Sequence, residues 1–431
     1  MKLVSLELQG FRGLADQTLN LKPEPFWAGE QQPIVFIGGN GSGKSSILEA
    51  ISVLLSCVTD RLENPKKNRQ SLQSLDISNQ NNQTTVSLTA SSDHPWLPAS
   101  QSPFQWQLAL TRAGINLKAK SDYDQLNRWL TQYREQFEQN PNLSFPVLVL
   151  YPVHRSFSRI EKHSKGQASL RQLETYKNAL TGQKPGFSDF FQWFRCREDL
   201  ENQQRLYDNP HYQDPQLTAV RHACETLLDG FSQLRVQREY DPPRMTIQKH
   251  QQTLEVTQLS DGEKNLLTLA GDLARRLAIA NPALKEPLQG RGVVLIDEIE
   301  LHLHPQWQSK VIEKLCRTFP NCQFILTTHS PQVITNLESV YLLVPSPQGT
   351  ICEQVRTYGK DSNRILETIM DTPERSRQMK TQFDRLFRLI EEGQLTEARQ
   401  LRLDLLQNLQ DDAPELVRAD WVIKRREVLG R

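Results

Sequence analysis

A glycine-rich segment near the N-terminus limits what this chain can fold into more than any other feature. The residues Gly38-Gly-Asn-Gly-Ser-Gly-Lys-Ser45 fit G-x-x-x-x-G-K-[ST] and follow the short apolar run Pro33–Ile37. Glycine lets backbone N–H groups converge on phosphate oxygens without Cβ clashes, and a helix starting after Gly43 adds positive potential. In this strand–loop–helix context we expect Lys44 to contact the β- and γ-phosphates of ATP and the Ser45 hydroxyl to bind Mg²⁺. The expected nucleotide contacts of this segment are Gly38, Gly39, Asn40, Gly41, Ser42, Gly43, Lys44, Ser45 and Ser46.

Two later apolar runs end in residues that suit phosphate chemistry. Val293-Val-Leu-Ile-Asp-Glu298 places two acids at the end of an expected strand, and Thr327-Thr-His-Ser330 ends the next one. Asp297 suits Mg²⁺ coordination, and Glu298 suits polarisation of the water that attacks the γ-phosphate. His329 stands where a γ-phosphate sensor is expected. Because acids and histidines at strand ends are often structural, these assignments depend on the glycine-rich segment.

A short motif stands between the glycine-rich segment and the acidic strand. In Leu259-Ser-Asp-Gly-Glu-Lys264, Ser260 is a good N-cap for a helix expected over Gly262–Ala280, and Glu263 completes a capping box. Taken alone, this motif is explained at least as well by helix capping as by ligand binding. Its position in the chain, after the glycine-rich segment and before the two acids, favours a function.

Together, these four motifs in this order resemble those of the ABC ATPase superfamily. Glu300-Leu-His-Leu-His-Pro305 and the turn Phe11-Arg-Gly13 are similar to the branch that includes RecF, SMC and overcoming-lysogenisation-defect proteins. The resemblance implies an α/β fold, an ABC-type P-loop NTPase head with mixed sheets, an inserted helical lobe and a C-terminal helical bundle. It also implies that Arg12 joins the nucleotide site.

The same resemblance implies that ATP with Mg²⁺ is hydrolysed between two heads, in a homodimer or a higher even oligomer. Ser260 and Gly262 of one head would then meet the phosphates held by the other, with Glu298, His329 and Lys44 as the catalytic residues. The motif departs from LSGGQ by carrying Asp261 and Glu263, which is common in this branch.

Three other segments look like PtuA, the ATPase of the Septu antiphage system, which also occurs beside some retrons. They are Tyr151-Pro-Val-His-Arg155, Phe190-Phe-Gln-Trp-Phe-Arg-Cys-Arg-Glu-Asp-Leu200 and Tyr358-Gly-Lys-Asp-Ser-Asn-Arg-Ile365. This resemblance implies a sensor or regulator of an associated nuclease in phage defence, with no nuclease centre in this chain. It implies an HNH nuclease partner similar to PtuB and, where a retron is present, a reverse transcriptase with its noncoding RNA. The sequence leaves open whether a retron accompanies this chain and what triggers defence.

The segment after Tyr151 lies where the superfamily carries its Q-loop, yet no glutamine stands there. Either His154 or Arg155 contacts phosphate or Mg²⁺-bound water, or Tyr151 is a core residue beside a surface arginine. Basic residues interleaved with acids suit a solvated face or a contact with nucleic acid. They include Arg155, Arg159, Lys162, Lys165 and Arg171.

Hydrophobic periodicity divides the chain into four expected parts. These are residues 1–120 and 233–357 for the two parts of the head, 121–232 for the lobe and 358–431 for partner-binding helices. In the last part, Phe383, Phe387 and Ile390 share one helix face, and similar stripes follow on two more helices. No acid-tipped strand is expected after His329, which argues against a Toprim nuclease domain.

Composition narrows the class of protein further. The 51 Lys and Arg residues balance the 50 Asp and Glu residues, which gives no overall signal for nucleic acid. The N-terminus lacks the apolar core of a signal peptide, and no run approaches the roughly 18 apolar residues of a membrane span. We therefore expect a cytoplasmic protein without a membrane partner.

A DNA-repair ATPase like RecF is the alternative to a defence regulator. A nuclease like the overcoming-lysogenisation-defect proteins and a transporter subunit fit less well.

Overall fold

The computed structural model divides the chain into two compact units, which are described one at a time. The first is Met1–Lys360 and the second is Asp361–Arg431. The described residues are 1–22, 31–64, 71–92, 102–115, 119–153, 172–182, 187–360, 362–368, 377–409 and 413–429.

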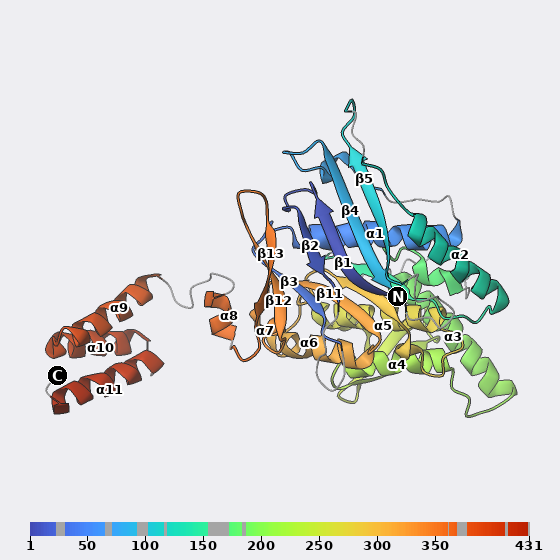
Figure 1. The fold of residues 1–431 in the computed structure, drawn as a ribbon. Helices are drawn as coiled ribbons and strands as arrows, with labels where there is room; N and C mark the ends of the chain where they lie inside the picture. The colour runs from blue at the N-terminus through green and yellow to red at the C-terminus, as the bar shows by residue number, and fades with distance from the viewer. Residues whose placement is uncertain are drawn as a thin grey trace. The chain divides into compact units, whose positions relative to one another are not determined.

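A six-stranded mixed sheet forms the centre of the first unit (Figure 1). Its strand order is β13-β12-β3-β11-β10-β6, and every neighbouring pair is parallel except β12 with β13. The strands are β3 (Ile34–Ile37), β6 (Val147–Tyr151), β10 (Gly292–Ile296), β11 (Cys322–Thr328), β12 (Ser339–Val344) and β13 (Ile351–Arg356). All residues of β3, β6, β10 and β11 are buried, as expected for parallel strands covered on both faces. The predicted α/β class is confirmed.

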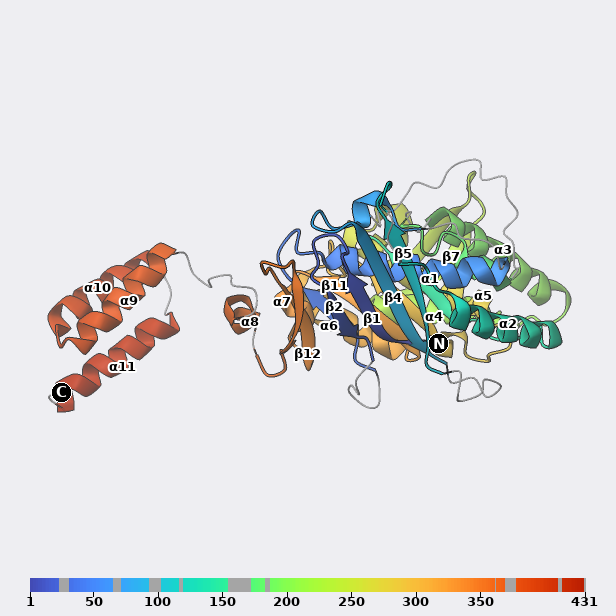
Figure 2. The same cartoon turned by 45° about the horizontal axis from the view of Figure 1, so that its top comes forward.

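Helices cover both faces of the central sheet. Helix α1 (Lys44–Glu63) directly follows the loop after β3 and packs between the central sheet and a second, antiparallel sheet (Figure 2). Helices α5 (Asp261–Ala280) and α6 (Pro305–Thr318) lie on the side away from the antiparallel sheet (Figure 1). Every residue of α5 from Asn265 to Ala280 is buried, so this helix is a core element of the head.

The antiparallel sheet has the strand order β2-β1-β4-β5. Its strands are β1 (Lys2–Gln9), β2 (Gln17–Asn20), β4 (Gln83–Ser91) and β5 (Phe104–Thr111). The buried side chain of Gln323 in β11 joins the two sheets. Its amide accepts from the N–H of Leu3 at 2.7 Å and donates to the carbonyls of Leu3 at 3.1 Å and Leu21 at 2.6 Å. These bonds fix the N-terminal strand against the strand that ends near His329.

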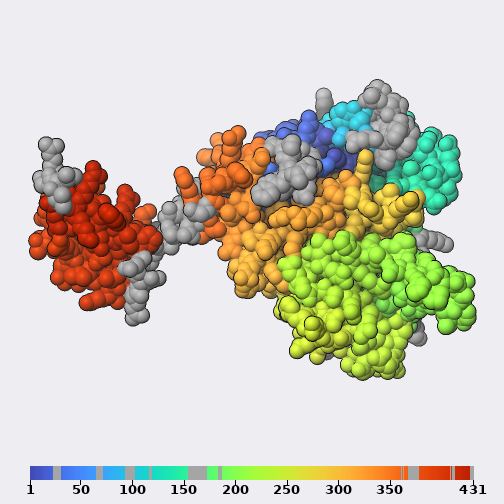
Figure 3. All heavy atoms as spheres, turned by 90° about the horizontal axis from the view of Figure 1, so that it is seen from below, coloured from blue at the N-terminus to red at the C-terminus, as the bar shows by residue number. Residues whose placement is uncertain are grey.

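The segment expected to form a helical lobe, 121–232, also completes the head. Helix α2 (Asp124–Gln139) packs on α1 and β5, and β6 belongs to the central sheet. Helices α3 (Phe187–Tyr207) and α4 (Pro215–Leu227) follow, and then an antiparallel sheet of β7 (Phe231–Gln237), β8 (Arg244–Lys249) and β9 (Gln252–Glu255). Figure 3 shows these later elements (green to yellow-green) gathered on one side of the head. The domain boundaries expected from the sequence stay predictions.

Ion pairs fasten α3 to α4, and apolar contacts fasten α3 to α5. Arg221 of α4 binds Glu198 and Glu201 of α3, each at 3.1 Å, and Glu201 is fully buried. The aromatic side chains at the start of α3 pack among themselves and against α5, where Phe190 lies close to Gly271. Charged groups buried with partners of opposite sign hold a unique geometry even where their net stabilisation is small.

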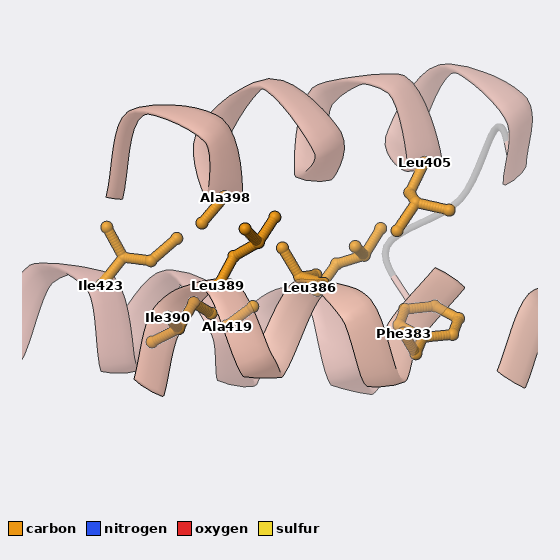
Figure 4. Close-up of a cluster of buried hydrophobic side chains, with 9 residues drawn as sticks. Phe383, Leu386, Leu389, Ile390, Ala398, Leu405, Ala419 and Ile423 are labelled. Atoms are coloured by element: carbon orange, nitrogen blue, oxygen red, sulfur yellow. The ribbon is translucent and has the colours of Figure 1, made fainter. Parts of the chain in front are cut away.

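The second unit consists of helices α8 (Ser362–Thr368), α9 (Arg377–Glu391), α10 (Leu395–Leu409) and α11 (Pro414–Leu429). The last three share a core, seen in Figure 4. Its buried members are Phe383, Leu386, Leu389, Ile390, Ala398, Leu405, Leu416, Ala419 and Ile423, and Phe387 and Leu401 pack against it. The predicted stripes are therefore confirmed as the faces of a small helical bundle.

Two strands that the sequence pattern does not predict follow His329. Strand β12 runs in parallel beside β3, and β13 pairs with it as the edge of the central sheet. Residues of β13 are half-buried or exposed, so this strand has a weak apolar signal in the sequence. Among the described helices, none combines the length and apolar character needed to cross a bilayer.

Candidate functional site

The loop Gly38–Ser45 presents backbone groups at the end of β3 and the start of α1. Gly41 and Gly43 have φ of 75° and 100°, a region that favours glycine. A Cβ on Gly43 would also lie 2.8 Å from the side chain of Leu14. Gly43 is the N-cap of α1 and has no side chain to cap it, so this helix end suits an anion. Gly39, Asn40, Gly41 and Ser45 are exposed.

Lys44 lies in the same loop and points back along it. Its side chain is buried, and its Nζ donates to the carbonyls of Gly38 and Gly39, both at 3.0 Å. Burial lowers the pKa of Lys44, against the opposing effect of the carboxylates of Glu298, Asp297 and Glu300. These charges act on Lys44 because β3 lies beside β11, and β11 lies beside β10, which ends just before Asp297.

A threonine organises the two acids after β10. The hydroxyl of Thr327, buried at the end of β11, donates to Asp297 Oδ1 and accepts the N–H of Glu298 at 2.8 Å. The N–H of Asp297 donates to the carbonyl of Tyr151 in β6 at 2.9 Å. Asp297 is thereby held by both neighbouring strands.

Glu298 and His329 are the partly exposed residues next to Asp297 and Thr327. Glu298 has a φ of 48°, and its Oε1 lies 4.0 Å from His329 Nε2. Each side chain is 32% exposed, so both can meet a ligand and solvent. The N–H of His329 donates to Glu300 Oε1 at 2.5 Å, which ties the histidine backbone to the segment after β10.

Arg12 adjoins the phosphate loop through α1. Its guanidinium donates to Ser46 Oγ at 3.0 Å and forms ion pairs with Glu49 at 2.5 Å and Asp76 at 2.9 Å. Burial alone would lower the pKa of Arg12, but the two carboxylates outweigh it and raise this pKa. A cavity of about 560 Å³ is lined by Arg12, Ser45 and Asp297 among other residues. The structure thus brings the expected Mg²⁺ ligands Ser45 and Asp297 to one cavity.

The motif around Ser260 lies at the start of α5. Ser260 is exposed and caps the helix: its Oγ accepts from the N–H of Glu263 at 3.4 Å, and Glu263 Oε2 accepts the N–H of Ser260 at 2.9 Å. Gly262 is buried, and a Cβ there would lie 2.3 Å from the carbonyl oxygen of His302. The predicted capping box is confirmed. The functional role of Ser260 and Gly262 stays a prediction.

The structure places Tyr151 but not the basic residues expected to contact phosphate or nucleic acid. His154, Arg155, Arg159, Lys162, Lys165 and Arg171 lie outside the described residues. Tyr151 is a fully buried core residue whose hydroxyl donates to Asp272 at 3.0 Å. Within the described ranges, no group of three or more His, Cys, Asp and Glu side chains could hold a metal ion.

Comparison with known proteins decides the family. Residues 115–335 match the family model described as "AAA domain, putative AbiEii toxin, Type IV TA system", and residues 1–93 match one described as "AAA ATPase domain". The chain is 30% identical over 400 residues to the retron Vc95 probable ATPase of Vibrio cholerae serotype O1 biovar El Tor, covering 81% of this chain and 76% of that protein. The chain belongs to the family of retron ATPases.

Other relatives agree with this family. The retron Ec83 probable ATPase of Escherichia coli is 29% identical over 435 residues, covering 87% of this chain and 77% of that protein. The Septu protein PtuA of Bacillus mycoides (strain KBAB4) is 38% identical over 79 residues, covering 18% of this chain and 11% of that protein. The predicted resemblance to PtuA is confirmed, and the chain is an ATPase.

A solved structure supports the fold. The SMC head bound to the C-winged helix domain of ScpA aligns with a TM-score of 0.50 and 17% identity, covering 83% of this chain and 98% of that chain. At this identity the likeness concerns the fold alone, and it confirms an ABC-type head.

Three positioning contacts were missed from the sequence. The sequence indicates Thr327 only as part of a motif and does not link Asp76 and Glu49 to Arg12. The signal for Thr327 is a hydroxyl two residues before the candidate His329, near the end of a buried strand. Asp76 carries no local signal, because it meets Arg12 only through the fold.

Proposed function

We propose that the chain binds ATP with Mg²⁺ and hydrolyses it at sites shared between two copies. The observation that carries this proposal is the meeting of Lys44, Asp297 and Glu298 at the carboxyl ends of β3 and β10, the two parallel strands on either side of β11. Ligands of open α/β sheets bind at that edge. Lys44 would neutralise the β- and γ-phosphates, and Ser45 with Asp297 would hold Mg²⁺.

Glu298 and His329 are the proposed reacting pair. Glu298 would orient and polarise the attacking water, since its carboxylate lies 4.0 Å from His329 Nε2 and remains partly open to solvent. His329 would donate to the γ-phosphate as charge develops there. The phosphate loop and the N-terminus of α1 supply N–H donors to the same oxygens.

The second half of the site would come from another copy. Ser260 is exposed at the N-terminus of α5, which is long and buried behind its first turn. Because the rest of α5 is buried in its own head, its exposed N-terminus has a fixed position. A helix N-terminus of this kind suits contact with the phosphates bound by a neighbouring head. We therefore propose an even number of heads, with Ser260 and Gly262 acting across the interface.

The ATP cycle is proposed to regulate a separate nuclease in antiphage defence. The relatives are retron ATPases and Septu PtuA proteins, and this supports a defence role. An HNH nuclease similar to PtuB is the proposed partner of helices α9 to α11, with a retron reverse transcriptase and its noncoding RNA as further partners. Trp421 is 74% exposed and Val417 is also exposed on α11, which supports a partner surface there.

The test is the variant Lys44→Ala beside the exposed control Lys285→Ala. Lys44→Ala is expected to lose ATP binding, measured by calorimetry, together with phage protection, measured by plaque counts in cells that carry the whole operon. Lys285→Ala is expected to keep both. Protection that survives without ATP binding would refute ATP-gated defence. Sensitivity to DNA damage in cells carrying Lys44→Ala, with intact phage protection, would favour the RecF-like alternative.

A further inference from the structure

The first turn of α5 carries two acids where an incoming polyphosphate would dock. Asp261 and Glu263 are the two positions at which this motif departs from LSGGQ. Unpaired carboxylates beside the γ-phosphate would repel it, most strongly where water is excluded. This feature conflicts with the proposed role of Ser260 unless the charges are offset.

The structure pairs each of these acids with a lysine. Lys249 Nζ lies 2.6 Å from Glu263 Oε1, and Lys264 Nζ lies 3.6 Å from Asp261 Oδ1. Glu263 is almost fully buried, whereas Asp261 is 81% exposed. Solvent screens the exposed pair of Lys264 with Asp261. The buried Glu263 therefore depends on Lys249 to offset its charge at the N-terminus of α5.

Lys249 is held in place by a different part of the fold. It ends β8, where it pairs with Phe231 of β7 and Gln252 of β9. Its Nζ also lies 5.4 Å from the ring centroid of Phe231, within the range of a cation–π contact. The pairing of β8 with β7 and β9 therefore fixes the backbone of Lys249, and the ammonium group contacts Glu263 from that position.

One carboxylate links this lysine to the serine. Glu263 uses Oε1 for Lys249 and Oε2 for the N–H of Ser260. Burial raises the pKa of Glu263, but the hydrogen bonds from Lys249 and Ser260 outweigh it and lower this pKa. The carboxylate stays ionised and anchored, with its charge offset.

We infer that Lys249 is a positioning residue for ATP hydrolysis: it neutralises Glu263 and fixes the capping turn that presents Ser260 to ATP bound by another copy. This inference rests on the proposed function. It assigns to the β7–β9 sheet an indirect part in the composite site. Lys249 acts through Glu263 and Ser260 and itself touches no reacting atom.

The first experiment compares steady-state ATP turnover in four full-length variants. Lys249→Met keeps the aliphatic stem but removes the charge, and kcat is expected to fall about tenfold, the size of effect that loss of one charge-assisted hydrogen bond produces. Lys249→Arg is expected to retain most of the activity. The double variant Lys249→Met with Glu263→Gln is expected to regain most of it, because glutamine still completes a capping box without a charge. Glu263→Gln alone serves as its reference.

The second experiment tests action across the interface. Lys249→Met and Glu298→Gln chains carrying different affinity tags are co-expressed, and the mixed oligomer is isolated. One of its composite sites has an intact Glu298 and an intact Ser260 turn, so it is expected to complete a single turnover of bound ATP at the wild-type rate. Each variant alone is expected to be at least severalfold slower.

The outcomes separate the two proposals. An inactive wild-type chain would refute the proposed function itself. An active wild type with full activity in Lys249→Met would overturn the inference about Lys249. Loss in Lys249→Met without recovery in either the charge-neutral double variant or the mixed oligomer would also overturn it, because a general folding role predicts that pattern.

Discussion

The hydroxyl of Thr327 donates a hydrogen bond to the carboxylate of Asp297. The same oxygen accepts the N–H of Glu298 at 2.8 Å, so one buried side chain of β11 sets both acids that follow β10. These acids follow a different strand, and Asp297 and Glu298 lie 30 and 29 positions earlier in the chain. Asp297 lines the same cavity as Ser45, and the Glu298 backbone adopts a positive φ of 48°.

Replacing this hydroxyl should therefore impair chemistry more than ATP binding. Thr327→Val keeps the shape but leaves the N–H of Glu298 and an oxygen of Asp297 without this partner. We expect kcat to fall about tenfold or more with a smaller change in KM. Steady-state ATPase assays check this, with Thr318→Val as control, because Thr318 is also buried and its hydroxyl donates to its own helix. Equal kinetics in the two variants would contradict the role given to Thr327.

Breaking a buried ion cluster in α5 should destabilise the head. Asp272 is 1% exposed and accepts from Arg275 at 2.6 Å, Arg276 at 2.7 Å and the hydroxyl of Tyr151. Asp272→Asn removes the charge that both arginines face, and a cost of about 3–5 kcal/mol in the free energy of unfolding is expected. The control Asp229→Asn breaks an exposed pair with Lys314 and should cost less than about 1 kcal/mol.

The difference in the free energy of unfolding between wild type and Asp272→Asn should depend on pH. Burial raises the pKa of Asp272, but the two arginines outweigh it and hold this pKa well below its usual range. A depressed carboxyl pKa contributes stability that is fully present above its unfolded value of about 4 and is lost as the pH falls toward the folded value. Urea titrations should thus show a constant gap between wild type and Asp272→Asn near neutral pH. The gap should narrow below about pH 4, and a gap that widens on acidification would contradict this account.

Gly262 should be required for structure as well as for its proposed contact with ATP. A Cβ there would lie 2.3 Å from the carbonyl oxygen of His302, whose own φ is 62°. Gly262→Ala is expected to lower stability by about 1–3 kcal/mol, because backbone must move to admit the methyl group. Gly13→Ala is the control, since its added Cβ meets nothing within 4 Å. Thermal melting that is the same for both variants would argue against tight packing at Gly262.

Local patterns predicted much of this molecule, and contacts between distant segments explain the rest. The glycine-rich loop, the strand before Asp297 and the capping box at Ser260 are visible in the sequence because each depends on neighbouring residues. The β12–β13 hairpin was missed because β13 is an edge strand with few buried positions. The contacts of Thr327 with Asp297 and of Lys249 with Glu263 join separate segments, so no local pattern reveals them.

The C-terminal unit should carry the partner surface. Removing residues 359–431 is expected to abolish copurification with an HNH nuclease from the same operon, since α9 to α11 form a core of their own and expose Trp421. Trp421→Ala should weaken capture about tenfold or more, as loss of a central aromatic contact does. Leu206→Ala in α3 removes an equally exposed apolar side chain and should leave capture unchanged. Recovery of the nuclease with the truncated chain would place the partner elsewhere.

The most direct test of the central claim follows ATP through the variant Glu298→Gln. Purified wild-type and variant chains are given ATP with Mg²⁺, and phosphate release is measured together with the nucleotide retained after gel filtration. The account predicts steady turnover by the wild type, and in the variant retained ATP, almost no phosphate release and a stable assembly of an even number of heads. Unchanged turnover in Glu298→Gln would contradict the assignment of Glu298 and, with it, the proposed site.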